Sequence, residues 1–129
     1  MPQAKYELCL LIDDNYIDNM INRKIIENEL FAKKVIVKES AEEALDELRK
    51  GQYKPDVIFL DVRMPQMNAF EFLKEYEKLK LSPDQQSPMI YILTSSLDPF
   101  DHRKVMESPY VTQFLYKPLT HQKLEEINL

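Results

Sequence analysis

The chain has 129 residues, 44% hydrophobic and 30% charged, a composition typical of one globular domain. Its formal net charge of −5 disfavours general nucleic-acid binding, and no apolar run approaches the roughly 20 residues that span a membrane. The single cysteine, Cys9, excludes an internal disulfide and fits a reducing, cytoplasmic compartment. We expect one domain over residues 1–129.

The first predicted strand covers Leu8–Ile12, a continuous apolar run that ends at Asp13 and Asp14. A helix should follow it, because Asn15 is a suitable N-cap and Asp18 stands in the first turn. The apolar residues of that helix recur at helical spacing, which predicts one buried face. This predicted face contains Ile17, Met20, Ile21 and Ile25.

A second strand and helix precede the centre of the chain. Val35–Val37 is a short apolar run, and Ser40 followed by Glu43 forms a capping box at the start of a helix. Gly51 stands where a C-terminal cap is expected. The apolar stripe of this helix contains Ala41, Ala44, Leu45 and Leu48.

The central strand is Val57–Leu60, four apolar residues that end at Asp61. Such an unbroken run is typical of a strand buried on both faces of a parallel sheet. Open α/β sheets place their chemistry at the carboxyl ends of the strands, so Asp61 is a candidate nucleophile, metal ligand or turn residue. Asn68 and Glu71 then open another helix, whose inner face contains Phe72, Leu73, Tyr76 and Leu79.

A polar loop with two prolines occupies residues 81–88, and a fourth strand, Met89–Leu93, ends at Thr94. Asp98 and Pro99 form a helix start, with the acid as cap and proline in the first turn.

The fifth strand is Val111–Tyr116, followed by Lys117, and Thr120 caps a short last helix with Leu124 and Ile127 as apolar residues. His102 and His121 have polar neighbours, and we interpret both as surface residues. Five strand–helix repeats predict a doubly wound α/β domain, a parallel sheet with helices on both faces.

In a parallel sheet the strand ends meet at one edge, which would bring Asp13, Asp14, Asp61, Thr94 and Lys117 together. Three neighbouring carboxylates repel one another, so this site favours a hard cation, Mg²⁺ or alternatively Mn²⁺. Lys117 and Thr94 could stabilise phosphoryl oxygens. Asp61 is then a candidate nucleophile that forms an aspartyl phosphate.

These motifs, in this order and spacing, resemble the receiver domain of two-component response regulators, in particular stand-alone receivers of the chemotaxis type. The resemblance runs from about Leu8 to Ile127. It implies a flavodoxin-like fold with five strands in the order 2-1-3-4-5 and five helices. It also implies phosphotransfer to Asp61 from a histidine kinase or a phosphotransfer protein, as in a phosphorelay.

The resemblance further implies roles for individual residues. Asp14, Asp61 and the backbone carbonyl of Arg63 would bind Mg²⁺, and Asp13 would assist, mostly through water. Lys117 would contact the phosphoryl group and precede a cis peptide bond to Pro118. Thr94 would contact the same group and act as a switch residue together with Phe114. Residues that would tune dephosphorylation or access to the site are Arg63, Ser95 and Ser96.

Four features depart from the family pattern. Ala69 stands where glycine is common, Ser95 follows the switch threonine in place of a smaller residue, and Phe114 lacks the hydroxyl of the more familiar tyrosine. The last helix is short, which weakens a surface that many receivers use to dimerise. We therefore expect a monomer or a weak dimer.

The leading hypothesis is a phosphorylation switch without enzymatic activity beyond phosphotransfer to itself and slow self-dephosphorylation. The acyl phosphate on Asp61 would pull Thr94, rearrange residues 94–98 and the following helix, and repack Phe114 inward. The surface of residues 99–127 would then change its affinity for an unidentified downstream protein, without direct contact to nucleic acid or a membrane.

Three alternatives remain open. A receiver-like scaffold would bind partners without phosphorylation. A phosphohydrolase of the haloacid dehalogenase type needs a second aspartate two residues after the nucleophile, where this chain has Arg63. A flavodoxin-like electron carrier must hold a phosphate in its first loop, where Asp13 and Asp14 would repel it.

Overall fold

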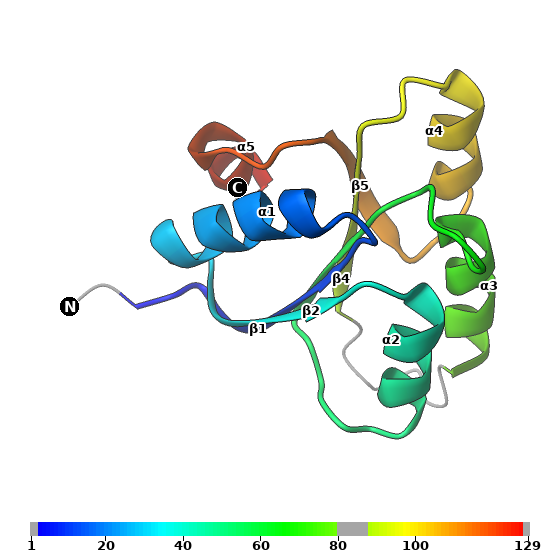
Figure 1. Cartoon of the computed structure of the whole chain (residues 1–129), viewed down its shortest axis with the longest axis horizontal. Coiled ribbons are helices and arrows are strands. Elements are labelled where there is room, and N and C mark those ends of the chain that lie inside the picture. Colours follow the sequence, from blue (N-terminus) through cyan, green and yellow to red (C-terminus); the bar gives the residue numbers. More distant parts are fainter. Residues whose placement is uncertain (1–2, 80–87, 128–129) are drawn as a thin grey trace.

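The computed structural model describes residues 3–79 and 88–127, and within them five strands alternate with five helices. The elements in chain order are β1 (Tyr6–Ile12), α1 (Tyr16–Asn28), β2 (Ala32–Lys38), α2 (Ala41–Arg49), β3 (Val57–Leu60), α3 (Ala69–Leu79), β4 (Met89–Thr94), α4 (Pro99–Met106), β5 (Val111–Tyr116) and α5 (His121–Ile127). The strands form one parallel sheet in the order β2-β1-β3-β4-β5 (Figure 1). The predicted doubly wound, flavodoxin-like fold is confirmed.

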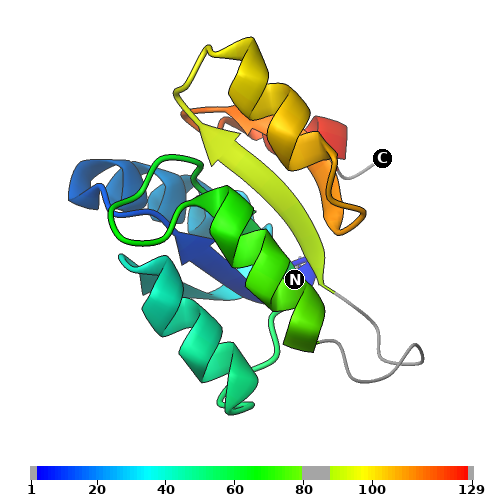
Figure 2. The same ribbon diagram turned by 90° about the vertical axis from the view of Figure 1, so that its right-hand side faces the viewer.

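The sheet is covered on both faces, and each strand alternates its side chains between two cores. Figures 1 and 2 show α2, α3 and α4 on one side of the sheet and α1 and α5 on the other. In β3, Ile58 and Leu60 pack toward the first group of helices, whereas Val57 and Phe59 pack toward the second. All four β3 residues are fully buried, as the unbroken apolar run predicts.

Side-chain caps place the helix starts where the sequence predicts them. Asn15 accepts from the Asp18 amide, and Ser40 accepts from the Glu43 amide. Asn68 and Glu71 form a reciprocal pair of bonds, the capping box of α3. Asp98 caps the start of α4 and Thr120 caps the start of α5 in the same way. At the other end of α2, Gly51 follows the last turn in the left-handed conformation, with a φ of 68°.

The predicted buried face of α1 is wrong for three of its four residues, and only Ile25 packs against the core, where it is partly buried. Ile17, Met20 and Ile21 are at least half exposed, and the residues of α1 that are buried are Asn19, Asn22 and Ile26. The Asn19 side-chain amide donates to the Asp13 carbonyl, and the Asn22 side chain accepts from the Leu119 amide. The helix therefore turns a polar edge toward the loops after β1 and β5, because the backbone groups there need partners.

Other predictions differ only in extent. β2 is a seven-residue strand and not the short run Val35–Val37, because backbone bonds continue to β1 on both sides of that run. Most of the predicted loop 81–88 lies outside the described residues. Across residues 3–79 and 88–127, no helix is long and apolar enough to cross a membrane.

Candidate functional site

The site lies at the carboxyl edge of the sheet, where backbone bonds fix the strand ends relative to one another. The Asp61 amide donates to the Ile12 carbonyl at 3.0 Å, which fixes the end of β3 beside the end of β1. The Lys117 amide donates to the Thr94 carbonyl at 2.9 Å, which fixes the end of β5 beside β4. The functional side chains therefore start from a rigid edge.

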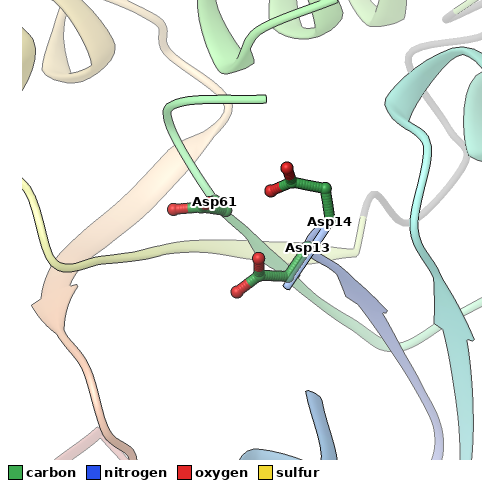
Figure 3. Close-up of side chains that lie close together, drawn as sticks. All are labelled: Asp13, Asp14 and Asp61. Carbon is green, nitrogen blue, oxygen red and sulfur yellow. The ribbon is translucent and has the colours of Figure 1, made fainter. Parts of the chain in front are cut away.

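Three carboxylates gather at the ends of β1 and β3 (Figure 3). One oxygen from each of Asp13, Asp14 and Asp61 lies within 4.8 Å of the other two. Asp13 and Asp61 are buried, whereas Asp14 is exposed, so the cluster opens to solvent on one side. Hard oxygen donors gathered in this way fit Mg²⁺, and they fit Mn²⁺ by the same chemistry.

Lys117 supplies the positive charge next to this cluster. Its Nζ lies 2.6 Å from Asp13 Oδ2, 2.8 Å from Asp18 Oδ2 and 3.6 Å from Asp61 Oδ1. Burial lowers the pKa of Lys117, but hydrogen bonds to Asp13 and Asp18 and the charge of Asp61 outweigh it and raise the pKa to about 12. The ammonium is therefore a permanent charge at neutral pH.

The environment of Asp61 disfavours the ionised form of its carboxyl group. Burial and the neighbouring charge of Asp13 raise the pKa of Asp61 to about 6, against the opposing effects of Lys117, the Val62 amide and the Thr94 hydroxyl. At pH 7 to 8 the carboxylate is mostly ionised. In the metal-free protein it is also more basic than an ordinary aspartate.

The peptide bond between Lys117 and Pro118 is cis, as the resemblance implies. Lys123 donates from its ammonium to the carbonyls of Tyr116 and Pro118, and the Asn22 amide group binds the next residue, Leu119. The loop that carries Lys117 is therefore held on both sides by other elements.

Two of the three predicted tuning residues bind the same acid of α4, Asp101. The Arg63 guanidinium binds the buried carboxylate of Asp101 in α4, at 2.9 Å from Nε and 2.7 Å from Nη2. The Ser96 hydroxyl donates to the same carboxylate at 2.7 Å, and its amide donates to Thr94 Oγ1 at 3.1 Å. Ser95 is exposed. In this state Arg63 and Ser96 therefore connect the site to α4.

Phe114 is half-buried in β5, between the core and the surface. Its ring stacks on His102 of α4 with centroids 4.5 Å apart, and it meets Tyr116 edge-on at 5.3 Å. His102 is exposed as predicted, and so is His121, which pairs with Glu29 and Glu125. The contact between His102 and Phe114 was not predicted.

The loop after Asp61 turns without the glycine that is common in the family. Gln66 adopts a φ of 69°, and the Met67 amide donates to the Pro65 carbonyl at 2.8 Å, which closes a tight turn. Ala69 is fully buried and its amide donates to the Val62 carbonyl at 3.1 Å. The left-handed residue of this loop is therefore Gln66.

Sequence reasoning missed Asp18 and Asp101 as partners of site residues. Both acids lie in the first turn of a helix that starts at the site's edge of the sheet. Their position in a first helical turn was the signal in the sequence, since acids there lie close to the loops that carry the site residues. Helix-start acids are also common for electrostatic reasons alone, so the signal did not identify a partner.

Comparison with known proteins agrees with this geometry. The model of the response regulator receiver domain family matches residues 9–128, so the chain belongs to that family. The sensory/regulatory protein RpfC of Xanthomonas campestris is 27% identical over 115 residues. That match covers 89% of this chain but only 15% of RpfC.

Solved structures give the same result. A two-component response regulator from Cytophaga hutchinsonii is 29% identical, with a TM-score of 0.82 over 98% of this chain and 96% of that one. A receiver domain protein from Methanospirillum hungatei shares the fold at 18% identity, with a TM-score of 0.76 over 96% and 91% of the two chains. The chain thus forms a receiver domain with an acidic cluster typical of receiver magnesium sites.

Proposed function

We propose that this receiver is a phosphorylation switch in which Asp61 accepts a phosphoryl group from a histidine kinase or a phosphotransfer protein. The observation that best supports this is the position of Asp61, with Lys117 3.6 Å away and a hydrogen bond from Thr94. A carboxylate beside a fixed cation and a hydroxyl donor is suited to attack phosphorus and to stabilise the transferred group.

In the proposed reaction an ionised Asp61 oxygen attacks the phosphorus of a phosphohistidine. A new P–O bond forms while the P–N bond breaks, and the electron pair of that bond returns to the imidazole. Lys117 balances charge on the phosphoryl oxygens, for which it must give up part of its contact with Asp13 or Asp18. Thr94 donates to one of these oxygens.

Asp13, Asp14, Asp61 and the backbone carbonyl of Arg63 would hold the divalent cation, with Asp13 acting mostly through water. When bound, Mg²⁺ or Mn²⁺ neutralises the negative charge that the carboxylates and phosphoryl oxygens build up together. The acids already lie close together, so little rearrangement of the chain is needed to bind it.

The proposed output surface is formed by α4, β5 and α5. Movement of Thr94 toward the phosphoryl group would shift residues 94–98 and α4 and repack Phe114, which is already half-buried. Exposed apolar residues lie on these elements and on the loop before α4, where they can contact a downstream protein. They are Leu97, Phe100, Met106 and Tyr116.

The phosphoryl donor would dock on α1. Tyr16, Ile17, Met20 and Ile21 are all at least half exposed, an unusual concentration of large apolar side chains on one short helix segment. The same segment contains Asp18, which contacts Lys117. A protein seated on it would therefore lie beside Asp61.

The remaining parts of the proposal concern the whole protein. We propose a single receiver domain over residues 1–129, a monomer or weak dimer, that acts in the cytoplasm, where the buried thiol of Cys9 stays reduced. Catalysis is limited to its own phosphorylation and slow dephosphorylation, because Arg63 occupies the position of the second aspartate of a haloacid dehalogenase-type phosphohydrolase.

Beryllofluoride, a stable mimic of the phosphoryl group, tests the site without a kinase. We expect wild-type protein to bind it only with Mg²⁺ or Mn²⁺, and the Asp61→Asn variant not to bind it, as measured by calorimetry and ¹⁹F NMR. Glu71→Gln, an exposed acid on α3, is the matched control and should bind like wild type. A receiver-like scaffold would fail to bind in every case, which would contradict the proposal.

A further inference from the structure

A buried carboxylate outside the acidic cluster connects the loop after Asp61 to the start of α4. Asp101 is fully buried, and Arg63 binds it with two parallel hydrogen bonds. A buried carboxylate is costly unless it is paired, and the two-pronged arginine–carboxylate pair is among the strongest and most direction-dependent contacts in proteins. We call this contact the Arg63–Asp101 joint.

Hydrogen bonds continue from the joint back to the site. The Ser96 hydroxyl donates to Asp101 Oδ2, and the Ser96 amide donates to Thr94 Oγ1. Arg63 itself stands two residues after Asp61. The chain of contacts therefore starts and ends at the phosphorylation site, and it includes both loops that a phosphoryl group on Asp61 would disturb.

We propose that Asp101 is a positioning residue that, through Arg63 and Ser96, holds the β4–α4 loop and α4 in their resting arrangement. This inference rests on the function proposed above. Thr94 Oγ1 accepts from Ser96 in the resting state, so its movement toward a phosphoryl group must break that bond or displace Ser96 from Asp101. The joint thus opposes the switch.

If the joint opposes the switch, its removal must change the affinity for a phosphoryl mimic in one defined direction. A ligand that binds only the switched state binds more weakly when more of the free protein is in the resting state, because only the switched fraction can bind it. If the joint favours the resting state, its removal must tighten the binding of beryllofluoride. Loss of the positive charge of Arg63 would by itself weaken the binding of an anion such as beryllofluoride. The proposal predicts the opposite change, tighter binding.

The experiment compares wild type, Arg63→Ala, Asp101→Asn and the double variant by titration with beryllofluoride at saturating Mg²⁺. We expect each single variant to bind about threefold more tightly or better, a typical effect of such networks, and the double variant to bind no more tightly than the single ones. Arg103→Ala in α4 and Glu107→Gln directly after it change the same charges at exposed positions and should bind like wild type.

Amide NMR spectra without ligand separate this inference from the proposed function. Arg63→Ala should shift the signals of Ser96 and Asp101 in the free protein, and unchanged signals would overturn the joint. Shifted signals with unchanged or weaker beryllofluoride binding would overturn its role in switching. Failure of wild type to bind beryllofluoride at all would overturn the proposed function and that role together. Arg63 is 63% exposed, so its variant tests the inference even if Asp101→Asn does not fold.

Discussion

Lys117 and Asp61 show how single residues are adjusted to one another in this site. The ammonium of Lys117 contacts three carboxylates, those of Asp13, Asp18 and Asp61, and the Lys117 side chain is 9% exposed. This charge does not fully offset the burial of Asp61, whose pKa is about 6. Without a metal ion, the fold therefore holds an ionised carboxylate at some cost in stability.

Asp61→Asn should stabilise the metal-free protein at pH 7.5. The pKa of Asp61 is raised from 3.8 to about 6 in the folded protein, so folding disfavours the ionised form. The cost is present above pH 6 and disappears as the pH falls toward 4, because the folded protein takes up the proton first. We expect a gain of about 1–3 kcal/mol at pH 7.5, measured by urea unfolding in EDTA.

The pH series supplies the control for that measurement. At pH 4 the Asp61 carboxyl is neutral in the fold, so wild type and variant should differ little. A constant difference between pH 4 and pH 7.5 would contradict the raised pKa of Asp61. Saturating Mg²⁺ at pH 7.5 should raise the stability of wild type and reverse the order of the two proteins.

At the level of elements, strand ends were predictable from the sequence and helix faces were less so. Asp61 and Thr94 follow apolar runs, and the parallel topology then brings them to one edge. The buried face of α1 was not predictable from periodicity, because Asn19 and Asn22 bind backbone groups of loops distant in sequence. The orientation of the Arg63 side chain was likewise not predictable, because it depends on Asp101, 38 residues later in the chain.

The orientation of α1 has a direct test in stability. Ile26 is fully buried and Ile17 is 64% exposed, although both belong to the apolar residues of one helix. Ile26→Ala should lower the free energy of unfolding by about 2–4 kcal/mol, whereas Ile17→Ala should change it by about 0.5 kcal/mol or less. Equal losses in urea unfolding would contradict the observed orientation of the helix.

The exposed apolar segment of α1 should matter for a protein donor and not for a small one. Ile17→Gln removes apolar surface without adding charge, so phosphotransfer from the cognate histidine protein should slow about tenfold, within the range for a residue central to an interface. Phosphorylation by acetyl phosphate should be unchanged. Lys24→Gln, an exposed site on the same helix, is the control. Equal slowing with both donors would place the defect in the site itself.

The whole molecule combines a rigid sheet with helices that differ in how they are attached. The sheet interior is fully buried on both faces and fixes Asp13, Asp61, Thr94 and Lys117 at one edge. By contrast, α4 is held to the site through the Arg63–Asp101 joint and the stacking of His102 on Phe114. A charge added at Asp61 would therefore leave the backbone of the sheet in place and act on α4 and on the Phe114 side chain of β5.

The most direct test of the central claim is covalent labelling by acetyl phosphate, followed by intact-protein mass spectrometry. With Mg²⁺ present, wild-type protein should gain the mass of one phosphoryl group, and the gain should disappear in EDTA and in Asp61→Asn. Trapping the acyl phosphate with borohydride should place the label on residue 61. No gain by folded wild-type protein, or a label that persists in Asp61→Asn, would contradict the claim that Asp61 is the phosphoacceptor.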